Sequence, residues 1–440
     1  MTEISKWKEV IPAPLCVAPW KAISVDADGM VRPDQIYKGG MGNLQTQNIE
    51  QIWNSEQWKS LRESHMIFRN DDRCRKCWNK EQLTGHSRRK FFESFFSERV
   101  DPSQMEEIVY PDRKGNIDLD NALNRPKITD FNNPDFIYLD ITGSNKCNLK
   151  CVHCSSFAST AWIPDEKKMH KHLAEHPNSF QLGPIEPYQA IDETIIDNLF
   201  SNEEYFENLQ FVAFRGGEPF YEKKNLYVLK KLISLGWHDR ISLDISTNGT
   251  VLDPEFLDLI SQFKKVILYI SLEGVGDLYS YCRGGNNYNQ EDLEKAINYF
   301  SRINNVELCL AYTTMVTNIF NIRKTWEWFQ QYKDRATITF SNTVFEPKHL
   351  SLYALSKEQK KEAYVMIKDI NDDLAWPFDK KDYLYSAGIW KLQEKLSEDS
   401  EEPDRNKIWL NFKNYITLLD KIRNTNLLDV EPVFRKYWNE

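Results

Sequence analysis

The distribution of hydrophobic and polar residues divides the chain into three sections of different character. The middle section, residues 135–347, contains six short apolar and β-branched runs, most of them separated by segments with a helical pattern. The six runs are Ile137–Ile141, Phe211–Phe214, Ile241–Ile245, Val266–Ile270, Val306–Leu310 and Ala336–Phe340. Such runs, alternating with helices, are typical of a parallel sheet that helices cover. We therefore predict an α/β fold, with an insertion over 155–205, where the gap between the first two strands is longest.

The section before the sheet, residues 1–90, is predicted to be a compact, loop-rich unit. The alternating stretch Ala22–Val25 and the turn at Asp28-Gly29 indicate a small β-hairpin. Apolar residues at helical spacing then predict a short helix over 49–61. The basic run Arg88–Lys90 at the end of the unit is interpreted as a solvated turn.

Two further segments complete the expected organisation. Residues 91–134 are polar and contain prolines, as a linker between domains would. Residues 348–440 are predicted to form a helical extension, because Ser356 and Gln359 have the spacing of a capping box and an apolar stripe follows them. We therefore expect domain boundaries near residues 90, 134 and 347.

Composition excludes several classes of protein. The 440 residues carry 56 Lys and Arg against 65 Asp and Glu, a net charge of −9, which argues against binding nucleic acid through bulk charge. No apolar run approaches the roughly 18 residues that a membrane span needs. The first ten residues lack the apolar segment of a secretory signal, so we expect a cytoplasmic protein. Its eight cysteines are too few for a disulfide scaffold and indicate reduced thiols or metal ligands.

Three of these cysteines crowd into one short segment, Cys147-x3-Cys151-x2-Cys154, directly after the first predicted strand. Three thiolates on one loop can hold three irons of a cubane cluster and leave the fourth iron open. A structural zinc site would need a fourth ligand, which His153 could supply. The spacing thus indicates a metal centre and leaves both metals as alternatives.

Polar motifs follow the other predicted strands as well. Arg215–Pro219 comes after the second strand, Ser246–Thr250 after the third and Ser271–Gly274 after the fourth. Ligands of parallel β/α folds bind where the strands end, so these motifs are expected to gather on one face. The paired glycines let backbone approach a ligand closely, and Glu218 is available to a cationic group.

The cysteine motif, together with Gly216-Gly217-Glu218-Pro219, resembles the radical S-adenosylmethionine (SAM) superfamily. The resemblance covers residues 135–347 and implies a partial (β/α)6 TIM-like barrel, in which Cys147, Cys151 and Cys154 hold a [4Fe-4S] cluster and SAM chelates the open iron. It further implies a set of SAM-binding residues: Gly216, Gly217, Glu218, Pro219, Ser246, Asn248, Ser271, Glu273 and His153.

Within that set, the resemblance gives Glu218 and the glycine backbone to the amino group of SAM. Ser271 and Glu273 would lie near the ribose, and His153 would flank the adenine. Arg283 is a further candidate, either for the SAM carboxylate or for a structural salt bridge. One electron would then cleave SAM to methionine and a 5′-deoxyadenosyl radical, which abstracts hydrogen from the substrate.

Residues 1–90 resemble the auxiliary iron–sulfur domains called SPASM and twitch, through Cys16, Cys74-x2-Cys77 and the tryptophans and glycines between them. These domains usually follow the barrel, whereas here the unit precedes it. The cysteine that usually follows the Asp-Gly hairpin is also replaced, by Arg32-Pro33-Asp34. An auxiliary cluster on Cys16, Cys74 and Cys77 would therefore need a fourth ligand, with Asp34 as a candidate, or an open iron. A zinc knuckle and a unit without metal are the alternatives.

The expected function is that of a radical SAM enzyme acting on a peptide or a small molecule. A peptide maturase and a small-molecule dehydrogenase remain open, and no general acid or base can be named. A reducing partner such as flavodoxin or ferredoxin is implied, whereas membrane and nucleic acid are not expected partners. The alternative from another class is a catalytically silent iron–sulfur or zinc module, and an RNA-modifying enzyme comes third.

Overall fold

The computed structural model describes residues 16, 18–66, 71–78, 87–97, 134–177, 179–284, 288–370, 389–398 and 402–439. The chain forms two compact units. The first consists of the residues up to Gly143 together with Ala190–Phe214 and Lys231–Ile241, and the second of Ser144–Gln189, Arg215–Lys230 and the residues from Ser242 onward. Most of the predicted linker, residues 98–133, lies outside the described residues.

The first unit is built around the predicted hairpin. Strand β1 (Ala22–Val25) pairs antiparallel with β2 (Met30–Arg32), which pairs with the short β3 (Gly42–Asn43). Between β1 and β2, Gly29 adopts φ +83°, and the Asp28 carboxylate accepts a hydrogen bond of 3.0 Å from the Met30 amide. The hairpin prediction is confirmed, and its turn depends on the glycine.

On its other side β1 runs parallel to β4 (Tyr138–Ser144), with Ala22 opposite Tyr138. Strand β5 (Phe211–Gly216) is the neighbour of β4, and both strands begin in the first unit and end in the second. The segment that carries the cysteine motif therefore follows directly after a buried strand, β4, as the apolar pattern predicted.

Short helices surround these strands. They are α2 (Ala18–Lys21), α3 (Ile49–Trp53), α4 (Glu56–Met66), η1 (Asp72–Cys74), α6 (Arg88–Ser97), α10 (Glu193–Leu199) and η4 (Glu203–Phe206). The single helix predicted over 49–61 is in fact two, because the chain turns at Asn54 and begins again at Glu56. Trp53 and Trp58, one from each helix, both pack against Phe136 with ring centroids 5.5 and 6.3 Å away.

The interpretation of Arg88–Lys90 as a solvated turn is wrong. These residues begin helix α6, and Arg88 is buried, with its guanidinium Nε 2.7 Å from the Asp34 carboxylate. The same guanidinium lies over the rings of Phe91 and Phe92, 4.6 and 4.8 Å from their centroids. A buried arginine is tolerated here because a carboxylate and two aromatic faces replace its water.

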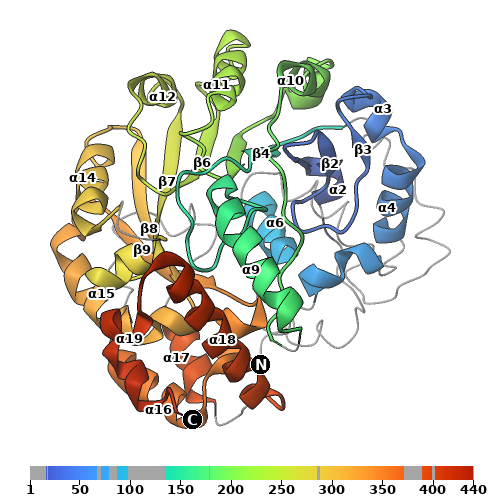
Figure 1. The fold of residues 1–440 in the computed structure, drawn as a ribbon. Coiled ribbons are helices and arrows are strands. Elements are labelled where there is room, and N and C mark those ends of the chain that lie inside the picture. Colours follow the sequence, from blue (N-terminus) through green and yellow to red (C-terminus); the bar gives the residue numbers. More distant parts are fainter. Residues whose placement is uncertain are drawn as a thin grey trace, which may run out of the picture. The chain divides into compact units, whose positions relative to one another are not determined.

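The second unit holds a purely parallel run of strands, in the order β6 (Ser242–Thr247), β7 (Lys265–Leu272), β8 (Val306–Thr314) and β9 (Thr337–Thr343). Figure 1 shows β7, β8 and β9 side by side, with α14 and α15 on their outer side. Strands β4 to β9 correspond to the six apolar runs, so the predicted α/β fold with an open parallel sheet is confirmed.

The second unit contains ten α-helices among the described residues. They are α9 (Ile163–Glu175), α11 (Lys224–Ser234, shared with the first unit), α12 (Pro254–Ile260), α13 (Asp277–Cys282), α14 (Gln290–Phe300), α15 (Ile322–Phe329), α16 (Lys357–Ile367), α17 (Ile389–Ser397), α18 (Arg405–Arg423) and α19 (Leu427–Val430). The capping box of Ser356 and Gln359 is present at α16. In the C-terminal part α17 packs on β9, and α18 packs on α9.

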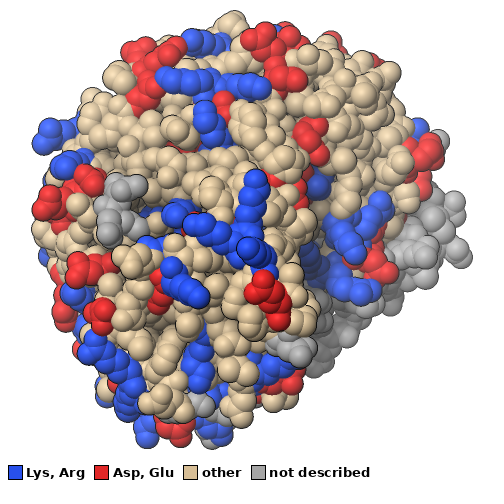
Figure 2. Space-filling view, in the orientation of Figure 1, with Lys and Arg blue, Asp and Glu red and all other residues tan. Residues whose placement is uncertain are grey.

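Within the described residues, no helix is both long enough and apolar enough to span a bilayer. Figure 2 shows acidic and basic side chains interspersed over one face of the molecule. This mixture agrees with the modest net charge of −9.

Candidate functional site

The loop that carries Cys147, Cys151 and Cys154 follows β4 and belongs to the second unit, and none of these three cysteines forms a disulfide. Two side chains from elsewhere hold its backbone. Trp162 Nε1 donates to the Cys151 carbonyl at 2.9 Å, and Tyr415 Oη donates to the Val152 carbonyl at 2.8 Å. Groups from outside the loop therefore help to fix it, in addition to the bond of 2.9 Å from the Cys154 amide to the Cys151 carbonyl within it.

The glycine-rich segment after β5 packs directly on this loop. The Gly217 amide donates to the Ser144 carbonyl at 2.8 Å, and the Glu218 amide donates to the Lys146 carbonyl at 2.9 Å. A Cβ atom at Gly217 would lie 2.3 Å from the Lys146 carbonyl oxygen, and Gly216 adopts φ +111°. Glycine is thus required at both positions, one for close contact and the other for its backbone conformation.

The Glu218 carboxylate lies buried beneath the cysteine loop. One of its oxygens accepts from Thr247 Oγ1 at 2.7 Å and from the Phe220 amide at 3.1 Å, and the other accepts from the Asn248 amide at 2.6 Å. Burial raises the pKa of Glu218, while these three hydrogen bonds oppose that rise. Because an ionised carboxylate offers about four acceptor positions, Glu218 retains room for one more donor.

Asn248 links the loop after β6 to the first cysteine. Its Nδ2 lies 3.5 Å from Cys147 Sγ and donates to Asn148 Oδ1 at 2.9 Å, while its Oδ1 accepts from the Thr250 amide at 2.9 Å. The Asn248 side chain therefore forms hydrogen bonds through both its oxygen and its nitrogen, and the nitrogen also directs an N–H group toward the sulfur of Cys147.

Arg283 is the charged group next to the second cysteine. Its Nη1 lies 3.3 Å from Cys151 Sγ and 3.2 Å from Glu273 Oε1, and its Nη2 donates to the Asn248 carbonyl at 3.4 Å. Of the two roles considered for Arg283, the structure contains the salt bridge, to Glu273. Burial raises the pKa of the Cys151 thiol to about 12, and the Arg283 charge opposes this rise. Arg283 thereby favours the thiolate, which is the form that binds metal.

The remaining predicted residues lie around the same loops. The Pro219 carbonyl accepts from Asn225 Nδ2 at 2.9 Å, which fixes the turn that follows Glu218. Ser271 is half-buried at the end of β7, two residues before Glu273. His153 lies within the cysteine loop, and its Nδ1 is buried with no hydrogen-bond partner.

These residues fit a cofactor with thiolate ligands and polar edges. Burial is the main cause of the raised pKa of Cys154, and charges on the nearby Cys151 and Cys147 raise it further. Two buried nitrogens beside them, Arg283 Nε and His153 Nδ1, have no partner. Thiolates are soft ligands of the kind that iron–sulfur clusters prefer. The two buried nitrogens need hydrogen-bond partners, which a bound cofactor with polar groups would provide. Among the residues that the structure describes, no three Cys, His, Asp or Glu groups lie together as a site for a single metal ion.

The second group of cysteines lies in the first unit, at Cys16, Cys74 and Cys77. Burial is the main cause of the raised pKa of Cys16, and charges on Cys77 and Cys74 raise it further. The candidate fourth ligand, Asp34, has its carboxylate 2.7 Å from Arg88 Nε, so it already has a buried cationic partner.

A different side chain lies next to this group, and sequence reasoning missed it. His65 is buried on helix α4, and its Nε2 lies 4.0 Å from Cys74 Sγ. Burial lowers the pKa of His65 to about 4, so the ring is in the neutral form that ligates metals. Its position only nine residues before Cys74 is the signal that could have identified it.

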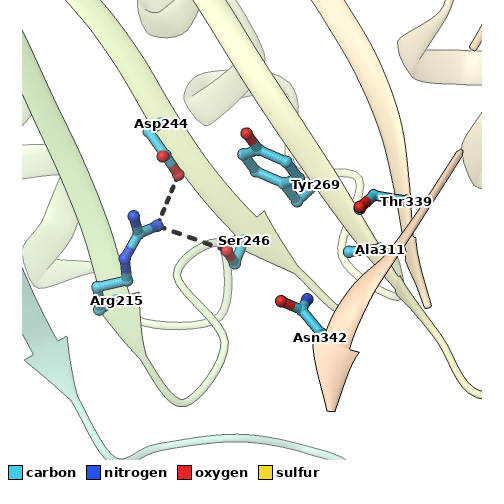
Figure 3. A pocket seen from close by; sticks show the side chains of 7 residues that line it. All are labelled: Arg215, Asp244, Ser246, Tyr269, Ala311, Thr339 and Asn342. Atoms are coloured by element: carbon cyan, nitrogen blue, oxygen red, sulfur yellow. Dashed lines mark hydrogen bonds and ion pairs between the residues drawn. The ribbon is translucent and has the colours of Figure 1, made fainter. Parts of the chain in front are cut away.

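A polar pocket of about 190 Å³ opens between the strands of the second unit (Figure 3). It is lined by Arg215, Asp244, Ser246, Tyr269, Ala311, Thr339 and Asn342, which come from β5 to β9. Arg215 Nη1 lies 2.6 Å from Asp244 Oδ1 and 3.5 Å from Ser246 Oγ. Asp244 was not predicted, although a carboxylate within the apolar run Ile241–Ile245 is a recognisable signal.

Two family profiles match the chain. Residues 141–335 match the radical SAM superfamily, and residues 16–78 match SPASM, an iron–sulfur cluster-binding domain. The chain thus carries a SPASM domain that precedes a radical SAM domain, and the resemblance predicted from the motifs is confirmed. These two domains imply a [4Fe-4S] cluster, SAM and an auxiliary iron–sulfur cluster.

Solved structures with a similar fold include three radical SAM proteins. One, anSMEcpe with bound AdoMet, is 18% identical, with 52% of this chain and 58% of that chain covered and a TM-score of 0.38. SuiB of Streptococcus suis bound to its precursor peptide SuiA is 18% identical, with 57% and 52% covered and a TM-score of 0.29. The methyltransferase TsrM from Kitasatospora setae is 15% identical, with 46% and 34% covered and a TM-score of 0.33.

The matched part therefore spans less than two thirds of each of these proteins. None of the curated proteins matches this chain.

Proposed function

We propose that Cys147, Cys151 and Cys154 hold the [4Fe-4S] cluster and that the loops around Glu218 and Asn248 bind SAM beside it. The observation that carries this proposal is the direct contact of both loops with the cysteine loop, through the Glu218 amide and the Asn248 side chain. When bound, the cluster supplies one electron that cleaves SAM to methionine and a 5′-deoxyadenosyl radical, which abstracts hydrogen from a peptide or small-molecule substrate.

The protein groups around the cysteines have separate tasks in this proposal. Glu218 uses its one remaining acceptor position for the ammonium group of SAM, whose charge compensates the buried carboxylate. Asn248 orients Cys147, and Arg283 stabilises the thiolate of Cys151. Since Glu273 pairs with Arg283, its task is to hold that arginine, and Ser271 is left to the ribose.

The other members of the set shape the site. Gly216, Gly217 and Pro219 fix the turn that carries Glu218. His153 flanks the adenine, which offers acceptors to a buried ring nitrogen. Ser246 lies at the border with the polar pocket, on the side from which substrate would approach. A small reducing protein such as flavodoxin or ferredoxin delivers the electron.

We further propose that Cys16, Cys74 and Cys77 hold an auxiliary iron–sulfur cluster and that His65, rather than Asp34, is its fourth ligand. The proximity of His65 Nε2 to Cys74 Sγ supports His65, and the Asp34–Arg88 ion pair speaks against Asp34. Electron paramagnetic resonance of the auxiliary cluster tests this. His65→Cys should retain the cluster with altered g-values, while Asp34→Asn should leave the signal unchanged. An altered signal in Asp34→Asn alone would reverse the assignment.

The central experiment is the release of 5′-deoxyadenosine from anaerobically reconstituted protein given SAM and dithionite, with Cys151→Ala as the control. Release that disappears in the variant would establish the chemistry. No release from protein with a full complement of iron and sulfide would favour a silent iron–sulfur module. Zinc in place of iron at these cysteines would overturn the proposal.

A further inference from the structure

The pocket of Figure 3 has a size that restricts what can enter it. Its volume is about 190 Å³. A cavity of roughly 150 Å³ accommodates a benzene molecule, whereas sites for whole drug-sized ligands measure roughly 300–1,000 Å³. The pocket is therefore large enough for one side chain or an equally small polar group, and too small for a larger ligand as a whole.

The position of the pocket relates it to the residues proposed for SAM. Ser246 on β6 lies two residues before Asn248, and Tyr269 on β7 lies two residues before Ser271. Successive side chains of a strand point to opposite faces, so residues two apart share a face. The pocket residue Tyr269 thus shares a face of β7 with Ser271, and Ser246 lies next to the loop that carries Asn248.

Within the pocket, Asp244 has an unused acceptor. Its side chain is wholly buried, and Oδ1 accepts from Arg215 Nη1 at 2.6 Å. The other oxygen, Oδ2, is buried and has no hydrogen-bond partner. A buried acceptor that is left unsatisfied destabilises the protein, and a charged acceptor does so more strongly. A donor on a bound molecule would remove this destabilisation.

The charge of the pocket restricts that donor further. Asp244 is balanced by Arg215, and the other polar lining groups are hydroxyls and an amide: Ser246, Tyr269, Thr339 and Asn342. An ammonium or carboxylate group entering this lining would bring a net charge that nothing compensates. A neutral group that donates a hydrogen bond would satisfy Asp244 Oδ2 without bringing a net charge into the pocket.

We propose that this pocket binds the reacting part of the substrate, and that this part is a neutral hydroxyl or primary amide that donates to Asp244 Oδ2. Arg215 acts as a positioning residue, because its hydrogen bond orients the carboxylate. The inference rests on the proposed function and restricts the reacting part of the substrate to a neutral hydrogen-bond donor. A Ser, Thr, Asn or Gln side chain of a peptide has this chemistry, and so does a small polyol or amide.

The test uses reconstituted holoenzyme with SAM, dithionite and a series of pentapeptides Gly-Gly-X-Gly-Gly, in which X is Ser, Asn, Ala, Asp or Lys. Stimulation of 5′-deoxyadenosine release and peptide binding by saturation-transfer NMR are both measured. Free N-acetylglucosamine serves as the non-peptide arm. We expect the Ser or Asn peptide, or the sugar, to stimulate release at least 10-fold more than the Ala, Asp and Lys peptides. Preference for the peptide or the sugar identifies the source of the group.

Two charge variants sharpen the test. Asp244→Asn removes the negative charge beside Arg215 and should shift binding toward the Asp peptide by about 10-fold, whereas Arg215→Met should shift it toward the Lys peptide. Lys230→Met, which breaks the exposed Lys230–Glu255 ion pair, is the matched control and should shift neither. The absorption of the cluster and the thermal unfolding of each variant report whether it folds.

The outcomes separate the inference from the proposed function. If wild-type protein releases 5′-deoxyadenosine but binds charged or apolar peptides as well as neutral polar ones, the inference is wrong and the function stands. If it releases none despite full iron, the function fails, and NMR binding still decides the inference. Should the wild type prefer neutral probes while neither charge variant that folds changes this preference, the selecting group is not the Arg215–Asp244 pair and the proposal is overturned.

Discussion

The two groups of cysteines are held by the chain in different ways. Around Cys151 the support comes from distant segments, since Tyr415 Oη bonds to a loop carbonyl 263 positions earlier in the sequence. Around Cys74 a side chain only nine positions away, His65, lies 4.0 Å from the sulfur. The first group is thus anchored to a segment far along the chain, whereas the second group and its histidine all lie within residues 16–77. This difference implies that the two clusters can be disturbed separately.

The largest expected effect comes from removing one cysteine of each group. Cys151→Ala should reduce 5′-deoxyadenosine release by more than 100-fold, because the residue is a proposed ligand of the cluster that supplies the electron. Cys74→Ala should keep release within about threefold of wild type while the iron content falls by about one cluster. Iron analysis and product quantification check both. Equal losses of release in the two variants would show that the groups act as one unit.

A smaller effect, confined to SAM binding, is expected from Glu218→Gln. The change removes the negative charge proposed to bind the SAM ammonium but keeps the shape of the side chain. Hydrogen bonds to charged groups contribute about 1.5–3 kcal/mol, so the KM for SAM should rise by roughly 10- to 150-fold. Steady-state kinetics measure this rise, and the iron content serves as the control. Iron lost in proportion to activity would indicate that Glu218 holds the loop rather than SAM.

Low pH provides a further comparison, through a buried histidine near the first group. His349 packs on Tyr415, with ring centroids 4.7 Å apart, and burial lowers its pKa to about 4. An unfolded chain takes up this proton near pH 6.5, so the contribution of His349 to stability is complete above that pH and is lost as the pH falls toward 4. The loss should reach about 2 kcal/mol at pH 5.

Urea unfolding of the reconstituted protein at pH 7 and pH 5 measures this loss. His349→Phe keeps an aromatic ring but cannot take up the proton, so it should lose less stability over the same interval. Identical losses in both proteins would assign the acid sensitivity to other groups.

The smallest effect is expected from Tyr415→Phe, which removes the hydrogen bond to the Val152 carbonyl. A single hydrogen bond of this kind contributes about 1 kcal/mol, and the carbonyl left behind is buried. The variant should lose iron to a chelator several-fold faster from the first cluster, with no change at the auxiliary cluster. Release followed separately by the spectra of the two clusters checks this. Faster loss at both clusters would mean that the anchor stabilises the whole chain.

Local sequence patterns predicted the strands, the hairpin and the cysteine loop, because each of these depends on neighbouring residues. They failed where the partner lies far along the chain. Arg88 was expected in solvent, yet it pairs with Asp34, 54 positions earlier. Asp244 lies in an apolar run, and only the folded sheet brings Arg215 next to it. The sequence pattern shows that a position is polar, but it does not show which group will form a hydrogen bond or ion pair with that side chain.

The glycine motif shows a related limit. Its spacing identified a ligand-binding segment, yet the reason for Gly217 is the carbonyl of Lys146, which no pattern in the motif contains. A motif can therefore be recognised correctly while part of its physical cause lies in the segment on which it packs.

The bond between Tyr415 and the cysteine loop has a consequence for how the protein is made. A ribosome adds roughly 5–20 residues per second, so the 263 positions between the two partners correspond to about 13–50 seconds of synthesis. During that interval the three thiols leave the ribosome without their anchor. Cys16, Cys74 and Cys77, in contrast, all leave the ribosome within the first 77 residues. We therefore expect the auxiliary site to be ready for iron first, and the SAM-binding cluster to be inserted only after helix α18 has been synthesised and packed.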